Sequence, residues 1–169
     1  MAMIRGWSDF AGEIVVAGRD PLPAHGAGRR VALIGRAEQL VPLVAPLADD
    51  AEKLTVFQRH PCWVVPERDA LLPARNPRRA VSVARRHLNA WIPERWMRRQ
   101  LTPSRTGADG SVPVLASDRY YPALLQAHCK LLTWPIDRLS RHGVRSVEGI
   151  EHHCDLIVVA APEQRSIAA

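Results

Sequence analysis

The first part of the chain alternates between short apolar runs and a helical pattern. Residues 29–35 form an apolar run that ends in glycine, and residues 53–58 form a second run. Both are typical of buried parallel strands. Between them, residues 37–47 place apolar side chains at helical spacing, and Pro42 and Pro46 are expected to keep this helix short or kinked. Strand, helix and strand within about 30 residues predict a βαβ unit of the dinucleotide-binding type.

The middle of the chain is rich in proline and arginine. Residues 61–77 contain four prolines and are predicted to form a loop. Residues 78–101 show the clearest helical pattern, which Pro93 is expected to divide into two helices. Residues 104–111 are polar and contain glycine, which predicts a loop.

The last third returns to strand patterns. Residues 131–133 predict a short strand. Residues 143–149 alternate between apolar and polar side chains and are bounded by a glycine at each end, which is typical of a hairpin. Residues 155–161 form the strongest buried-strand pattern in the chain. The whole pattern predicts an α/β fold: a partial Rossmann-like domain with a parallel sheet and flanking helices, plus a short helical insert and a β-hairpin.

Composition places the chain among globular proteins. Of its 169 residues, 47% are apolar and 24% are charged, which is enough apolar surface for a core. No apolar run approaches the roughly 20 residues that a membrane helix needs, and the first ten residues lack the apolar stretch of a signal peptide. We therefore expect no transmembrane segment and a cytoplasmic location. Cys62, Cys129 and Cys154 are too widely spaced to suggest disulfides or a zinc site.

Most of the positive charge comes from arginine, since only Lys53 and Lys130 among the 23 basic residues are lysines. Arginine pairs recur along the helical stretch from Arg78 to Arg99, and the first two pairs, seven residues apart, share the face opposite the apolar positions Val81, Ala84, Leu88 and Trp91. One interpretation is the solvated face of a packed helix. The other is a basic binding module that contacts an acidic partner through this stretch. We expect no nucleic-acid partner, because an arginine excess alone is weak evidence for one.

Other polar groupings assign no catalytic residue and no metal ligand. Neighbours in the run from His152 to Asp155 point to opposite faces of a strand, so at most two of them can converge on a metal. Cys129 lies beside Lys130, where a lowered thiol pKa would be the sign of a reactive cysteine. No G-x-S-x-G elbow or hydrolase triad occurs. Four tryptophans are expected to pack in the core: Trp63, Trp91, Trp96 and Trp134.

Four segments resemble one protein family, and they occur in that family's order. They are residues 9–15, like the start of an F-x-G-x-x-x-H-x-x-x-W fingerprint; residues 54–66; residues 117–124, with the sequence SDRYYPAL; and residues 135–160. Together they resemble the NADP-domain portion of class B flavin-dependent monooxygenases, the Baeyer–Villiger and flavin-containing monooxygenases.

The resemblance implies a function and a set of cofactor-binding residues. The family carries out NADPH- and O2-dependent oxygenation of small organic molecules, as Baeyer–Villiger oxidation of ketones or as heteroatom oxygenation, with FAD and NADP as cofactors. Arg59 corresponds to the arginine that pairs with the ribose 2′-phosphate, which favours NADP over NAD. Gly35 and Gln39 are further candidates near the phosphate-binding turn. The chain divides into a βαβ portion (1–66), an arginine-rich helical insert (67–104) and strands that lead back toward the flavin domain (105–169).

The chain also departs from the family pattern. The fingerprint's His and Trp fall on Val16 and Asp20, and the family's Lys-Arg pair falls near Val112 and Pro113. The second and third glycines of the G-x-G-x-x-G turn after Gly35 are deleted, and no other G-x-G-x-x-G occurs to hold FAD. We therefore expect the isolated chain to be inactive, and a separate flavin-domain chain is a candidate partner.

Overall fold

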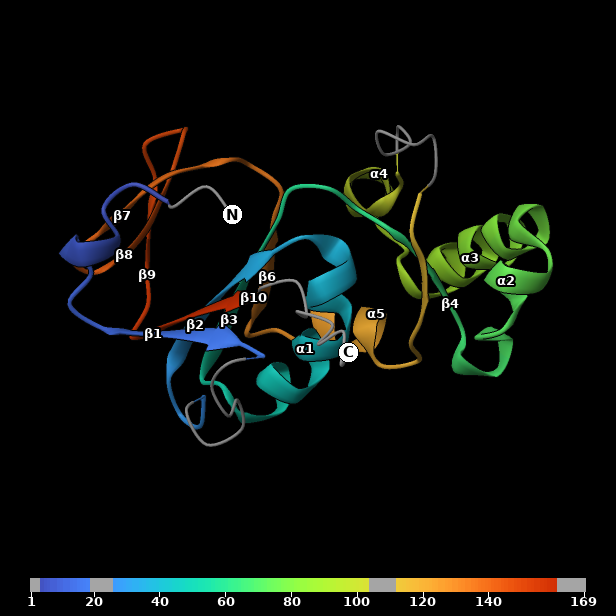
Figure 1. The fold of residues 1–169 in the computed structure, drawn as a ribbon, viewed down its shortest axis with the longest axis horizontal. Helices are drawn as coiled ribbons and strands as arrows, with labels where there is room; N and C mark the ends of the chain where they lie inside the picture. The colour runs from blue at the N-terminus through green and yellow to red at the C-terminus, as the bar shows by residue number, and fades with distance from the viewer. Residues whose placement is uncertain (1–3, 19–25, 104–111, 161–169) are drawn as a thin grey trace, which may run out of the picture.

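A computed structural model gives the fold and describes residues 4–18, 26–103 and 112–160 (Figure 1). Its elements, in chain order, are η1 (Trp7–Asp9), β1 (Glu13–Ala17), β2 (Arg30–Gly35), α1 (Ala37–Asp50), β3 (Lys53–Gln58), β4 (Trp63–Val65), η2 (Glu67–Asp69), α2 (Leu72–Arg75), α3 (Pro77–Trp91), α4 (Arg95–Leu101), β5 (Val114–Ala116), α5 (Tyr120–Leu124), β6 (Cys129–Leu132), β7 (Ile136–Ser140), β8 (Gly143–Ser146), β9 (Glu151–His153) and β10 (Leu156–Ala160). Three predictions concern residues outside these ranges. They are the loop at 104–111, the last residue of the strand predicted at 155–161, and the position of the fingerprint's Trp at Asp20.

A five-stranded parallel sheet forms the centre of the molecule, in the order β1-β10-β2-β3-β6. This confirms the predicted α/β class. The runs predicted at 29–35, 53–58 and 155–161 are strands β2, β3 and β10, and the strand predicted at 131–133 lies two residues earlier as β6. The edge strand β1 was not predicted, because its burial comes from pairing with β10 at the far end of the sequence.

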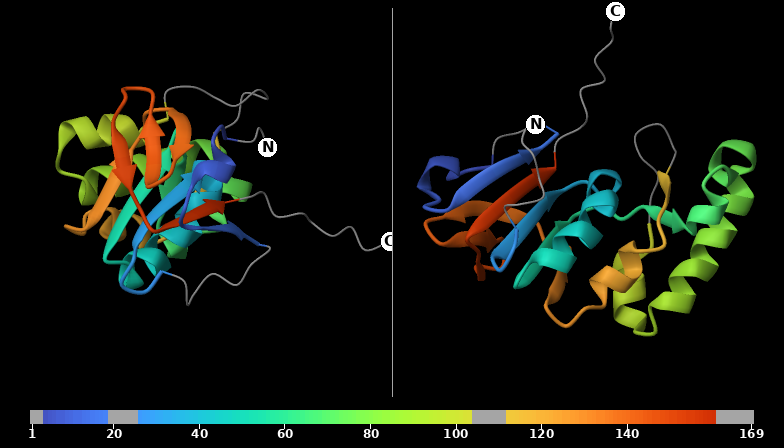
Figure 2. Two further views of the ribbon diagram at one scale, coloured as in Figure 1. Left: turned by 90° about the vertical axis from the view of Figure 1, so that its left-hand side faces the viewer. Right: turned by 90° about the horizontal axis from the view of Figure 1, so that it is seen from below.

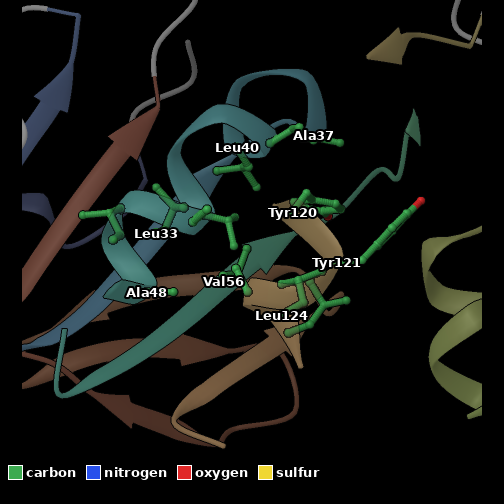
Figure 3. Close-up of a cluster of buried hydrophobic side chains, with 14 of the residues drawn as sticks. Leu33, Ala37, Leu40, Ala48, Val56, Tyr120, Tyr121 and Leu124 are labelled. Carbon is green, nitrogen blue, oxygen red and sulfur yellow. The ribbon is translucent and has the colours of Figure 1, made fainter. Parts of the chain in front are cut away.

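The two faces of this sheet bury different side chains because residues alternate along each strand. Val31 and Leu33 of β2 face α1 and α5, in the larger core cluster that Figure 3 shows. Ala32 and Ile34 face the opposite way and pack with Leu139 and Val144. The second face is therefore covered by the antiparallel sheet β7-β8-β9 together with the short η1, whereas α1 and α5 lie on the first face. The hairpin predicted at 143–149 is part of this three-stranded sheet (Figure 2).

Helix α1 is longer than the sequence predicted. It runs without interruption through Pro42 and Pro46 to Asp50, although each proline lacks the N–H of a helical hydrogen bond. Both prolines lie on the exposed side of the helix, while Leu40 and Val44 are fully buried against the sheet. Tertiary packing of this apolar side outweighs the two missing hydrogen bonds.

The loop predicted at 61–77 contains short elements instead. Strand β4 pairs in parallel with β5, and η2 and α2 follow it. Trp63 is buried, and its ring lies 5.8 Å from the guanidinium carbon of Arg85. Strand β4 has only three residues, which is too short to show a repeating apolar pattern in the sequence. The four prolines of this stretch were therefore the stronger signal, and they predicted a loop.

The helical stretch confirms its predicted division, since α3 ends at Trp91 and α4 begins at Arg95, on either side of Pro93. It projects from one end of the molecule (Figure 1). Ala84 and Leu88 are buried and the arginine pairs 78/79 and 85/86 of α3 are exposed, as predicted, while Arg98 of α4 is half-buried. The prediction was wrong for Trp91, which is 41% exposed. Trp96 and Trp134 are also exposed, so of the four tryptophans expected in the core only Trp63 is buried there.

An ion pair joins the two central strands at their amino ends. Arg30 of β2 donates to the carboxylate of Asp155, just before β10, through Nε at 3.0 Å and Nη2 at 2.6 Å. This bidentate contact with the guanidinium of Arg30 lowers the pKa of Asp155 to about 2. The pair links β10 to β2 at the end of the sheet opposite the carboxyl ends, where the candidate site lies.

Within the described ranges, no helix combines the length and the apolar character required to cross a bilayer.

Candidate functional site

The carboxyl ends of β2, β3 and β10 open into a cleft of about 810 Å³. Ile34, Phe57 and Val159 form part of its floor, and all three belong to the sheet face that carries β7-β8-β9. Ligands of open parallel sheets bind outside the carboxyl ends of the strands. The candidates from the sequence, Gly35, Gln39 and Arg59, all line this one cleft. The structure thus brings together residues that are up to 24 positions apart.

Gly35 allows β2 and β10 to approach closely at the cleft. A Cβ atom on Gly35 would lie 2.8 Å from the Cβ of Ala160 and 3.1 Å from Cδ2 of Leu40. Its backbone does not adopt a positive φ. Its role in this fold is therefore steric, because a side chain would separate the strands or displace α1.

The connection between β2 and α1 is a single residue, Arg36, which is the N-cap of the helix. Its backbone N–H donates to Oε1 of Gln39 at 3.2 Å, so the Gln39 side chain closes the first turn of α1. The Arg36 guanidinium in turn pairs with the Glu38 carboxylate at 2.8 Å. A G-x-G-x-x-G turn offers free N–H groups to a pyrophosphate, whereas here one N–H is bonded to Gln39 and a carboxylate lies in the first turn.

Arg59 follows β3 directly and lines the cleft. Gln58, the last residue of β3, pairs with Gly35 of β2, so Arg59 lies immediately beyond the point where both strands end. Its side chain is exposed, and no carboxylate within the described part of the chain forms an ion pair with it. An unpaired guanidinium at the carboxyl edge of a parallel sheet is suited to a phosphate ligand.

Sequence reasoning missed four polar or aromatic groups in the cleft. His60 and the exposed ring of Trp134 line it, and so does an ion pair between Arg5 and Asp137. Trp134 was expected in the core. The signal that could have found it is its position directly after the strand predicted at 131–133, just as Arg59 directly follows the strand predicted at 53–58.

The remaining candidates lie outside the cleft. The positions that replace the family's Lys-Arg pair, Val112 and Pro113, do not line it, and the Pro113 carbonyl accepts a hydrogen bond from Trp63. Burial raises the pKa of the Cys129 thiol to about 11, the opposite of the lowered pKa that would mark a reactive cysteine beside Lys130. Burial likewise raises the pKa of Cys62 and of Cys154 to about 12. In the parts of the chain with described coordinates, no cluster of His, Cys, Asp and Glu could hold a metal ion.

The sheet order defines an α/β protein with a Rossmann-type parallel sheet, and its cleft lies at the carboxyl ends of the strands. No family model matches the chain. Among curated proteins, the FAD-binding monooxygenase ktnD of Aspergillus niger is 28% identical, over 93% of this chain and 31% of that protein. A Baeyer–Villiger monooxygenase of Streptomyces coelicolor is 25% identical, over 92% of this chain and 36% of that protein.

A solved structure shows the same fold. Cyclohexanone monooxygenase from Rhodococcus sp. Phi1, bound to NADP+, superposes with a TM-score of 0.77 at 20% identity, over 95% of this chain and 43% of that one. The resemblance to class B flavin-dependent monooxygenases is therefore confirmed. The chain spans about a third of the length of the curated relatives that it matches.

Proposed function

We propose that this chain is the NADP(H)-binding portion of a flavin-dependent monooxygenase. The observation that carries the proposal is Arg59, an exposed cation that has no ion-pair partner among the described residues and lines the cleft where β2, β3 and β10 end. It lies at the end of the second strand of the βαβ unit, where a basic residue pairs with the 2′-phosphate of NADP. The relatives' names and the NADP+-bound neighbour support the same assignment.

The cleft fits one half of NADP better than the other. Arg59 would hold the 2′-phosphate, and the apolar floor suits the adenosine attached to it. The turn after Gly35 is poorly built for the pyrophosphate, because Gln39 caps it and Glu38 adds a negative charge. In a complete enzyme FAD would supply the oxygenation chemistry on a small organic substrate. This chain's share is to bind and orient the nucleotide, and we propose that it is inactive without a flavin domain.

Replacing Arg59 with alanine should remove about half of the stabilisation by NADPH. Saturating NADPH should raise the melting temperature of the wild-type chain, since a ligand at 100 times its Kd adds about 2.7 kcal/mol of stability. Arg59→Ala should weaken NADPH binding by about tenfold, through loss of a charge-assisted phosphate contact. NADH should stabilise the wild type much less than NADPH does. A thermal melt followed by far-UV circular dichroism measures all three effects.

Arg86→Ala is the matched control, because Arg86 is an exposed arginine on α3 outside the cleft. It should melt with the same NADPH-dependent shift as the wild type. A wild-type melt indifferent to NADPH would refute the proposed function. An equal loss of the shift in Arg59→Ala and Arg86→Ala would show that general positive charge, and not this site, binds the nucleotide.

A second candidate function rests on the helical segment. Residues 72–101 contain eight arginines and one glutamate, so this segment carries more positive charge than the net +6 of the whole chain. Within the described residues, none of these arginines pairs with a carboxylate. We propose as the alternative that α3 and α4 contact an acidic partner.

The alternative predicts salt-sensitive binding to a polyanion. Labelled DNA, used as a probe of polyanion affinity, should bind at 50 mM salt and lose affinity by at least about tenfold at 200 mM. The double variant Arg78→Ala/Arg79→Ala should bind more weakly than Arg138→Ala/Arg141→Ala, which removes the same charge from β7 and the turn after it. Equal weakening by both variants, or no binding at 50 mM salt, would exclude this function.

A further inference from the structure

Trp134 is an exposed aromatic residue inside the cleft that no feature of the fold explains. Its side chain is 52% exposed, although it follows a strand of the central sheet and lines the same cleft as Arg59. A half-exposed indole loses part of the stabilisation that burial would give it. Trp134 is therefore available to a ligand.

The strand register brings Trp134 and Arg59 to the same end of the sheet. Phe57 of β3 pairs with Leu132 of β6, and Arg59 and Trp134 each follow two residues after their member of this pair. Both residues lie just beyond the carboxyl ends of these two neighbouring strands. Both also line the same cleft, so a ligand bound there can contact the cation and the ring together.

A cation next to an exposed ring suits a ligand with a phosphate close to a flat heteroaromatic group. Bases stack on aromatic side chains largely independently of sequence, because every base presents a π-face. In a 2′-phosphoadenosine, one sugar separates the adenine from the phosphate. The Asp137 carboxylate on the adjoining wall is neutralised by its ion pair with Arg5, so this wall does not repel an anion.

We propose that Trp134 is the stacking surface for adenine and that the cleft recognises the 2′-phosphoadenosine half of its nucleotide. The inference rests on the proposed function and deepens it. Arg59 holds the 2′-phosphate while the ring of Trp134 holds the base. The capped turn at Arg36 and Gln39 adds little affinity from the pyrophosphate. The ligand class is thus 2′-phosphorylated adenine nucleotides, including half-molecules that lack nicotinamide.

Isothermal titration of the wild-type chain with four nucleotides tests the ligand class. The Kd of 2′,5′-ADP is expected to lie within about threefold of the Kd of NADP+. Both nucleotides should bind at least about tenfold more tightly than 3′,5′-ADP and NAD+. Tighter binding of NADP+ than of 2′,5′-ADP by more than tenfold would overturn the proposal, because the other half of the dinucleotide would then supply the affinity.

Variants of Trp134 test the stacking role. Trp134→Ala should weaken 2′,5′-ADP and NADP+ by about tenfold each, and Trp134→Phe should stay within about threefold of the wild type. Trp96→Ala is the control, since Trp96 is 61% exposed on α4 and outside the cleft. Adenine stacking should also quench indole fluorescence, and Trp134→Phe should lose this quenching while it keeps its affinity.

The outcomes separate this inference from the proposed function. Binding of NADP+ that depends on Arg59 but is unchanged in Trp134→Ala overturns only the inference. No binding of NADP+ or 2′,5′-ADP to the folded wild type overturns both.

Discussion

Gly35→Val is expected to destabilise the fold by about 3 kcal/mol, the upper part of the usual range for overpacking. The new Cβ would lie 2.8 Å from the Cβ of Ala160, an atom that moves only with the backbone of β10. The two γ-methyl groups add further volume toward Leu40, which is fully buried. The central strands would have to separate at the edge where the cleft lies. Urea unfolding followed by circular dichroism measures the loss as a lower transition midpoint.

Gly26→Ala is the matched control for this substitution. A Cβ on Gly26 would meet Cδ2 of Leu47 at 3.5 Å and Cγ2 of Val31 at 3.9 Å, which are ordinary contacts. We expect its free energy of unfolding to stay within about 0.5 kcal/mol of the wild type. A rise is also consistent with this role, because alanine lowers the conformational entropy of the unfolded chain. If Gly35→Val unfolded at the same urea concentration as Gly26→Ala, the close approach of β2 and β10 would be wrong.

Tyr120→Phe is expected to cost about 2 kcal/mol of stability. The Tyr120 hydroxyl donates to Oε1 of Gln58 at 2.5 Å, and both side chains are almost completely buried. Removing the hydroxyl leaves the Gln58 carbonyl oxygen buried without this donor, which costs about 1–3 kcal/mol. The same burial raises the pKa of Tyr120 well above its usual value, so the hydroxyl stays protonated as a donor. Thermal and urea unfolding both measure the loss.

Tyr121→Phe provides a direct comparison one residue away. The Tyr121 hydroxyl is also buried but has no hydrogen-bond partner among the described residues. The ring extends from the core cluster (Figure 3) and lies 5.2 Å from the His87 ring of α3, measured between centroids. Removing an unsatisfied buried hydroxyl should be neutral or stabilising by up to about 1 kcal/mol. A loss in Tyr121→Phe equal to that in Tyr120→Phe would mean that the Gln58 contact contributes nothing specific.

Both hydroxyls lie in the segment that resembles the family's SDxYYPAL motif, yet they have different environments. Tyr120 fixes Gln58, and Gln58 directly precedes Arg59 at the end of β3. The hydrogen bond thereby anchors the strand end from which the candidate phosphate-binding cation projects. Loss of the bond is expected to lower nucleotide affinity as well as stability, whereas Tyr121→Phe should lower neither.

Sequence patterns predicted the elements whose signal is local. The apolar runs of β2, β3 and β10 and the division of the helical stretch at Pro93 are confirmed. Patterns failed where distant partners decide the structure. Strand β1 depends on β10, β4 depends on β5, and α1 continues through two prolines because its other side is packed on the sheet. Trp134 was misassigned because an apolar residue alone does not show whether it faces a core or a cleft.

The sequence by itself determined the α/β class, the family resemblance and the loss of the glycine-rich turn, because these follow from the order of residues along the chain. It also singled out Arg59 as the phosphate-binding candidate. Only the tertiary structure decided that Gly35 serves a steric purpose, that the side chain of Gln39 caps α1, and that Trp134 lines the same cleft as Arg59. Each of these depends on strand register or on contacts between segments that are distant in sequence. Register is set by the packing of whole strands and leaves no mark at a single position.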